Sequence, residues 1–322
     1  MNPRSLKAWT AIVASAVLAI AAAGCGDDSD APPEDAQESF RIPDSLLTPL
    51  EGYGLTVDKY HPVNGGVMAN EVIEIRYPPS EIARAIAVKV FGDALDAYRT
   101  VTGELGEPAE GRVYIIGAKD LDEYRFLTTK EWWYYAVIQG DTIYSEPFDI
   151  MLKRYDPISE RTFARIGYTQ RMAQMALERM TRGRIPVWLK EAIASHTADE
   201  RNILRVQIEQ FRKSLVGYSP SLEEIEHNIA VSNDKALARA SYFMAYRMLE
   251  NLLDEHTMED VMAFVRALGE GRTLDEASIE NFGIAYVELA PSLVPEDLFE
   301  GAGEVVQPVD VRKEQHEGHD HE

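Results

Sequence analysis

The chain has 322 residues and a formal net charge of −22 at pH 7, with 32 Lys and Arg against 54 Asp and Glu. This acidic field opposes binding to nucleic acid and to anionic lipid head groups, and the basic residues form no cluster that would offset it. Cys25 is the only cysteine, which excludes a disulfide scaffold and a thiolate metal site in the rest of the chain.

The first 25 residues have the composition of a secretory signal peptide. Arg4 and Lys7 precede the apolar run AWTAIVASAVLAIAAAG, which is too short and wrongly flanked for a membrane span. The end of this run with the next residue, AAGC at 22–25, resembles the lipobox of bacterial lipoproteins, with Ala22 where leucine is usual. The resemblance implies that Cys25 is lipidated and that the protein is exported and anchored at the cell envelope. Ordinary cleavage nearby, with Cys25 incidental, is the alternative.

Two polar segments enclose the predicted folded part of the chain. Residues 26–40 and 301–322 contain too few apolar residues to offset the entropy of ordering, so a disordered tether and a disordered acidic tail are expected. Residues 41–300 between them form the predicted domain, with a sheet-containing lobe at 41–183 and a helical lobe at 184–300.

The first lobe alternates strand and helix patterns. Apolar residues recur at every fourth position after Ser80, which predicts a helix that Ser80 caps. Apolar runs with turn signals between them predict strands, and the turn QGD joins the last two. The predicted elements are a strand at 71–78, the helix from Ser80 to near Gly103, a strand at 112–118, a short helix at 119–127 and two strands within 132–146.

Only helices are predicted after residue 160. The sequence places capping boxes at Ser221 with Glu224, at Thr257 with Asp260 and at Thr273 with Glu276. The predicted helices cover 161–183, 186–199, 202–216, a short segment after Ser221, 234–256 with Ser232 as its cap, 258–271 and 274–283. The predicted fold class is therefore α+β, a small mixed β-sheet with flanking helices followed by a helical lobe.

The segment IPVWLKEAIASHTADE carries Trp188, Leu189 and Glu191 in the spacing P-x-W-L-x-E. Together with IEIRYPP, RVYIIG, DTIYSE and the ending LGEGRTLDEASIENFG, it resembles the peptidase-MA-like gluzincin domains, which are zinc metallopeptidases of the thermolysin type. The resemblance implies a gluzincin-like fold with an H-E-x-x-H metal helix and with Glu191 as the third ligand. Two histidines four residues apart face one metal because they lie only about 40° apart around the helix.

The metal motif itself is degenerate in this chain. Counting back from Glu191 by the family's spacing places the first His, the general-base Glu and the second His at Ile166, Gly167 and Gln170. Isoleucine cannot ligate a metal, glycine offers no base, and the glutamine amide is a poor zinc ligand. One remaining carboxylate does not hold Zn²⁺, so no cofactor is predicted. The lost base would explain Gly167, which costs about 1 kcal/mol in a helix interior.

The seven histidines supply no replacement motif, because no HExxH occurs in the sequence. His196 and Glu200 are four residues apart, but a solvated helix face explains the pair better than a metal site does. In the tail, His316, His319 and His321 alternate with acidic residues and form a weak candidate metal site.

The leading hypothesis is a lipid-anchored binding or scaffolding pseudoenzyme that lacks peptidase activity. Its partners are the membrane, through the N-terminal lipid, and a peptide, a protein or an envelope component in the former active-site cleft, but no nucleic acid. One alternative is an active metallopeptidase or hydrolase with an unrecognised zinc centre, which the survival of Glu191 motivates. A second alternative is a metal-capturing lipoprotein that acts through its His-containing tail.

Overall fold

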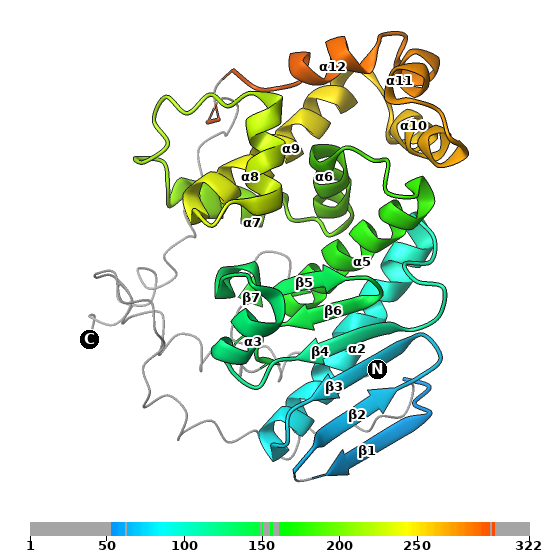
Figure 1. The fold of residues 1–322 in the computed structure, drawn as a ribbon, viewed down its shortest axis with the longest axis vertical. Helices are drawn as coiled ribbons and strands as arrows, with labels where there is room; N and C mark the ends of the chain where they lie inside the picture. The colour runs from blue at the N-terminus through cyan, green and yellow to red at the C-terminus, as the bar shows by residue number, and fades with distance from the viewer. Residues whose placement is uncertain are drawn as a thin grey trace, which may run out of the picture.

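A six-stranded mixed sheet lies below a helical region in the computed structural model, which describes residues 53–61, 63–148, 150, 155–156, 161–296 and 298–299 (Figure 1). The strand order is β1-β2-β3-β4-β6-β5. The strands are β1 (Val57–His61), β2 (Gly65–Ala69), β3 (Ile73–Tyr77), β4 (Val113–Gly117), β5 (Ala136–Gln139) and β6 (Thr142–Ser145), and a separate short pair consists of β7 (Tyr155–Asp156) and β8 (Arg161–Thr162).

The helices are α2 (Glu81–Glu104), α3 (Leu121–Thr128), the 3₁₀ turn η3 (Trp132–Tyr134), α5 (Phe163–Thr181), α6 (Val187–Thr197), α7 (Arg201–Glu209), α8 (Leu222–Val231), α9 (Lys235–Glu255), α10 (Met258–Glu270), α11 (Leu274–Phe282) and α12 (Tyr286–Ser292). Within the described ranges, no helix is long and apolar enough to cross a membrane.

The sheet topology places β5 at the edge that faces the helical region (Figure 1). β3, β4 and β6 are parallel to one another, and α2 supplies the crossover between β3 and β4. β5 runs antiparallel to β6 through a tight turn at Gly140, whose φ of +62° suits glycine. No further strand of the described chain pairs with the outer edge of β5.

One hydrophobic core runs through both predicted lobes. Its largest fully buried side chains come from strands β2, β3, β4 and β6 and from the helices, where they include Phe91, Tyr168, Trp188, Phe243 and Phe264. Helix α5 packs against α2, β5, α6 and α10, so it joins the sheet to the helical region. This position explains why nearly every residue from 164 to 177 is buried.

The predicted fold class is confirmed by this mixed sheet with its flanking helices and helical C-terminal region. Ser80 caps α2 as predicted, and the capping boxes at Ser221, Thr257 and Thr273 all form. The long helix differs from the prediction at its start, because Asp234 caps α9 and Ser232 instead ends α8. Cys25, residues 26–40 and the tail histidines lie outside the described residues.

Three further predictions for the elements were wrong. Residues 132–134 form a 3₁₀ turn instead of the start of a strand. The helix predicted over 202–216 stops at Glu209, after which the chain continues in turns. Only helices were predicted after residue 160, but Arg161–Thr162 form strand β8 and α5 begins at Phe163; strands β1, β2 and β7 and helix α12 also had no counterpart in the prediction.

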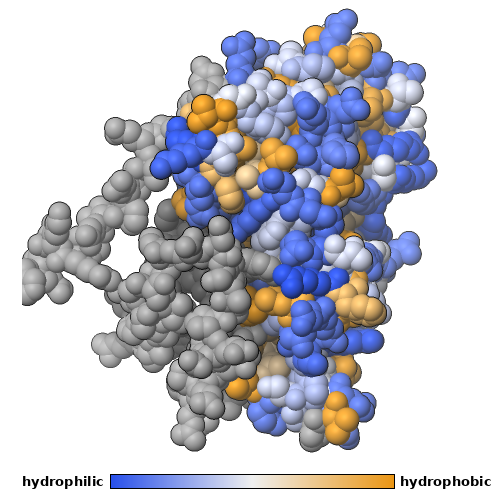
Figure 2. Space-filling model, turned by 60° about the vertical axis from the view of Figure 1, so that its left-hand side comes forward, coloured by the Kyte–Doolittle hydropathy of each residue, from blue (hydrophilic) through white to orange (hydrophobic). Residues whose placement is uncertain are grey.

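The surface shown in Figure 2 is largely hydrophilic, and its hydrophobic residues occur in separate groups. The large hydrophobic side chains that are most exposed lie on different elements of the chain, at Val63, Phe126, Val216 and Val287. The exposed hydrophobic residues therefore do not form one patch. A cleft lies instead between β5 and the helical region.

Candidate functional site

Helices α5 and α6 face each other through polar side chains in an otherwise apolar interior. Gln170, Arg171 and Gln174 of α5 are buried, as are Glu191 and Ser195 of α6. Buried polar groups destabilise a fold unless they are hydrogen-bonded. The contacts of these five residues therefore define what the site can do.

The first set of contacts is a closed network of four residues, the Gln170 network. Gln170 Nε2 donates to Ser195 Oγ at 3.1 Å, and the Tyr135 hydroxyl donates to Gln170 Oε1 at 3.1 Å. Glu200 completes the network, because it accepts from Ser195 at 2.8 Å and shares the single Tyr135 hydroxyl proton with Gln170, also at 3.1 Å. Each polar group of Gln170 thus has a protein partner.

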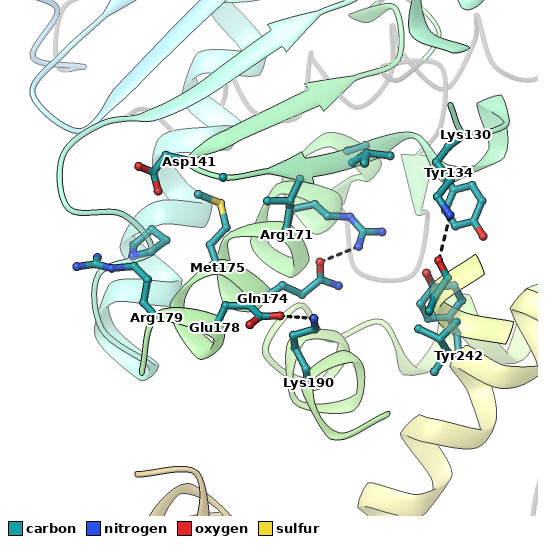
Figure 3. Close-up of a pocket in the computed structure, with 17 residues that line it drawn as sticks. Lys130, Tyr134, Asp141, Arg171, Gln174, Met175, Glu178, Arg179, Lys190 and Tyr242 are labelled. Carbon is teal, nitrogen blue, oxygen red and sulfur yellow. Dashed lines mark hydrogen bonds and ion pairs between the residues drawn. The ribbon is translucent and has the colours of Figure 1, made fainter. Parts of the chain in front are cut away.

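The second set is a chain of three residues, the Arg171 chain. Arg171 Nη1 donates to Gln174 Oε1 at 2.8 Å, and Gln174 Nε2 donates to Glu191 Oε2 at 2.5 Å. Gln174 therefore lies between a guanidinium and a carboxylate. It accepts a hydrogen bond from Arg171 and donates one to Glu191. Figure 3 shows the guanidinium pointing toward the amide of Gln174.

Burial dominates the electrostatics of the two carboxylates. It raises the pKa of Glu191, although Arg171, Lys190 and the hydrogen bond from Gln174 act in the opposite direction. Burial likewise raises the pKa of Glu200, against the hydrogen bond from Ser195 and the charge of Arg171. Arg171 is the buried cation that acts on both carboxylates.

The charge of Arg171 persists in this interior. Burial acts to lower its pKa, but Tyr135, Tyr242, Glu191 and Glu200 raise it above the ordinary value overall. Guanidinium groups are protonated in proteins at all physiological pH values. The site therefore contains a permanent positive charge.

Tyr135 connects the sheet to this polar layer in a strained conformation. Its φ of +43° lies in the left-handed region, which is uncommon for a residue other than glycine. The backbone N–H of Glu146 donates to the Tyr135 carbonyl at 2.8 Å, and the Arg171 guanidinium carbon lies 5.8 Å from the centre of the Tyr135 ring. Strain of this kind occurs where the surrounding structure fixes a residue.

The Tyr135 ring packs closely against Gly167, where a larger residue would collide with it. A Cβ atom added at Gly167 would lie 2.6 Å from Cε2 and 3.1 Å from Cδ2 of that ring. Because the Tyr135 hydroxyl is held by Gln170 and Glu200, the ring has little freedom to move aside. The glycine is thus explained by close packing and needs no lost catalytic side chain.

Gly167→Ala is expected to destabilise the protein by about 1–3 kcal/mol, the usual cost of overpacking. The gain in helix propensity would be about 1 kcal/mol and would not compensate. Gly103→Ala on α2 is the matched control, because nothing lies within 4 Å of its added Cβ, and it should stabilise by a few tenths to about 1 kcal/mol. Urea unfolding of both variants measures the difference, and equal behaviour of the two would contradict this role for Gly167.

The positions that were predicted as the degenerate motif have different neighbours in the structure. Ile166 lies in a small apolar cluster with Ala198 and Ile203, and Gly167 lies against Tyr135. Gln170 contacts α6 through Ser195, and Glu191 contacts α5 through Gln174. Ile166 thus packs with apolar side chains, whereas Gln170 and Glu191 are held by polar contacts between α5 and α6.

Arg171 and Gln174 were not singled out from the sequence. The signal that would have found them is the spacing of Gln170 and Gln174, which lie four residues apart as the two histidines of a metal helix do. His196 and Glu200 do not act together. His196 is exposed beside Tyr246, whereas Glu200 is buried in the Gln170 network. In the part of the chain that the structure describes, no three or more His, Cys, Asp or Glu side chains are grouped to hold a metal ion.

A cleft of about 520 Å³ opens beside the Arg171 chain, here called the edge cleft. Its walls come from β5 and the turn after it, from α5, from Lys190 of α6 and from α8 and α9 (Figure 3). Lys190 Nζ pairs with Glu178 Oε1 at 2.5 Å, and Arg179 Nη1 donates to the Glu107 carbonyl at 2.9 Å. The volume lies within the roughly 300–1,000 Å³ of ligand sites.

No protein-family model matches the chain, and neither a curated protein nor a solved structure does. The resemblance to the peptidase-MA-like gluzincin domains therefore depends on the residues of this chain. The geometry of α5, α6 and β5 is the further ground on which a function can be proposed.

Proposed function

We propose that this protein is a pseudopeptidase, a lipid-anchored binding protein of the cell envelope whose gluzincin-like cleft holds a polypeptide segment without cleaving it. The observation that carries the proposal is Arg171, a buried permanent cation hydrogen-bonded to Gln174, which itself contacts Glu191. A divalent metal ion placed there would be repelled by the guanidinium. The side chains of Gln170, Arg171 and Gln174 on α5 also offer no imidazole or carboxylate, so Glu191 would be the single strong ligand among them.

The proposal includes a register for the lost motif that lies one turn later than the sequence analysis placed it. Gln170, Arg171 and Gln174 occupy positions i, i+1 and i+4, which is the spacing of the two histidines and the general base. Contacts to α6 support this register, because Gln170 and Gln174 contact Ser195 and Glu191, which are themselves four residues apart. In this register arginine stands where the base would be.

The edge cleft supports binding of an extended polypeptide. Ala136, Val137 and Ile138 of β5 line it, and the outer edge of β5 has no partner strand among the described residues. An exposed strand edge offers backbone N–H and C=O groups to an extended segment, which then adds a strand to the sheet. Apolar side chains from the facing helices, such as Met175 and Ile229, would cover such a segment.

Metal content and peptide cleavage test the loss of catalysis. The mature protein, with and without residues 313–322, is purified in the absence of chelator and analysed for zinc, and is then incubated with a mixed peptide substrate. The domain is expected to hold much less than one zinc per chain and to cleave no peptide, because Arg171 excludes the metal. One zinc per chain in the tail-deleted protein, together with cleavage, would overturn the proposal.

A further inference from the structure

The guanidinium of Arg171 is buried but makes few contacts. The residue is only 8% exposed, and its one hydrogen bond to another described residue is that from Nη1 to Gln174. Its Nε has no hydrogen-bond partner in the described structure. Arginine has five N–H donors in a planar fork that matches a carboxylate, so most of the donors of this group are unused.

The two nearby carboxylates do not fill the fork. Glu191 reaches Arg171 through the amide of Gln174, and Glu200 is held by Tyr135 and Ser195. Neither forms a direct ion pair with the guanidinium among the described residues. A buried cation without a direct anionic partner is costly, so a ligand that supplies the anion would gain from it.

Other donors line the same part of the edge cleft. Lys130 Nζ lies 5.0 Å from the centre of the Tyr134 ring and donates to the Ala230 carbonyl at 3.2 Å, which leaves further N–H groups of the ammonium for a ligand. Burial raises the pKa of Tyr242, so its hydroxyl keeps its proton and can donate. Figure 3 shows Lys130, Tyr134 and Tyr242 around the end of the cleft toward which Arg171 extends.

The whole-protein charge limits how acidic the ligand can be. A net charge of −22 repels polyanions at long range, whereas the guanidinium acts at short range inside the cleft. The remaining walls include Ala136, Val137 and Ile138 of β5 with Met175 of α5. A ligand with a single carboxylate among apolar groups would avoid strong repulsion by the acidic protein and would also match the apolar walls of the cleft.

We propose that Arg171 is a carboxylate receptor, and that the edge cleft selects extended, largely apolar polypeptide segments carrying one Asp or Glu side chain. This inference rests on the proposed function, because it names the kind of segment that the cleft holds. It assigns to Arg171 the direct recognition of the acidic side chain, with Lys130 and Tyr242 as supporting donors.

The test uses two pools of capped hexapeptides with randomised apolar and small residues. One position is fixed as Glu in the first pool and as Gln in the second, so the pools differ in charge but hardly in shape. Bound peptide is separated from free peptide by gel filtration with the full mature protein and quantified by mass spectrometry. The wild-type protein should retain the Glu pool about tenfold or more over the Gln pool, as expected for a charge-assisted bidentate contact.

Three variants locate the receptor. Arg171→Lys keeps the charge but loses the fork, so its preference for Glu should fall to a few-fold. The double variant Arg171→Gln/Glu191→Gln removes the cation together with one buried carboxylate, so that folding is spared, and should show no preference. Arg179→Gln is the matched control, because Arg179 lines the same cleft but donates to the Glu107 carbonyl, and its preference should equal that of the wild type. Circular dichroism establishes that each variant is folded.

The outcomes separate this inference from the proposed function. Equal retention of both pools by the wild type would overturn the carboxylate receptor and leave a polypeptide-binding cleft in place. Retention of neither pool would overturn both proposals. A preference for Glu that survives in the folded Arg171→Lys protein and in the folded double variant would assign recognition to another residue.

Discussion

The variant Gln170→His/Arg171→Glu/Gln174→His is expected to bind one zinc ion with a Kd of about 1 μM or below. The two imidazoles would lie on the face of α5 that contacts α6, where Gln174 Nε2 lies 2.5 Å from Glu191 Oε2. Glu191 would supply the third ligand, and water the fourth, as in catalytic zinc sites. The substitution at position 171 also removes the cation that repels the metal.

Zinc binding by this variant is measured by metal analysis and by the shift of thermal unfolding on adding zinc, both without residues 313–322. Zinc at 100 times its Kd stabilises a folded protein by about 2.7 kcal/mol. The control is Ile166→His/Gly167→Glu/Gln170→His, the same three residues placed one turn earlier. It should bind no zinc and should unfold easily, because position 166 faces Ala198 and Ile203 and position 167 meets the Tyr135 ring. Zinc binding by the control alone would reverse the proposed register.

Arg171→Met is expected to lower the free energy of unfolding by about 1–3 kcal/mol at pH 8, the cost of leaving a buried hydrogen-bonding group, here Gln174 Oε1, without its partner. Methionine fills most of the aliphatic volume but leaves Glu191 and Glu200 without the cation that lowers their pKa values. Arg179→Met, on the exposed face of the same helix, is the control and should change stability by no more than about 0.5 kcal/mol.

The deficit of Arg171→Met should grow with pH. Without Arg171 the pKa values of both carboxylates in the folded state rise further above the unfolded value of about 4.3. A raised folded-state pKa gives stability that is present below the unfolded pKa and is lost as the pH rises, at most about 1.4 kcal/mol per pH unit for each carboxylate. Urea unfolding at pH 5 and pH 8 measures this, and a deficit that is the same at both values would argue against Arg171 as the countercharge.

Local signals account for most of the fold that could be predicted. Each helix cap depends on a contact between residues three apart, in which the capping side chain accepts from the backbone N–H of the third residue after it, as at Ser80, Ser221, Thr257 and Thr273. Such caps can be predicted without tertiary information. β2 was missed because Gly65 and Gly66 lower its strand propensity. Packing explains it: a Cβ at Gly66 would lie 2.0 Å from the Tyr77 ring of the paired strand β3.

The candidate site could be predicted only in part. Glu191 and Gln170 were found from spacing, and both contact the facing helix. The register around them was ambiguous by one turn, since the α5 residues that face α6 depend on how the two helices pack. Arg171 gave no signal because arginine is rarely buried, and its role follows only from its burial beside Gln174.

The positive charge beside Glu191 belongs to the covalent chain, because Arg171 supplies it. In a zinc metallopeptidase the positive charge of the site comes from a bound metal ion, and chelation or scarcity of zinc removes it. Here the guanidinium lies beside Gln174 and Glu191 as soon as α5 and α6 have packed together, whatever the supply of metal. The electrostatic character of the edge cleft is therefore set by the amino-acid sequence and does not depend on a bound ion.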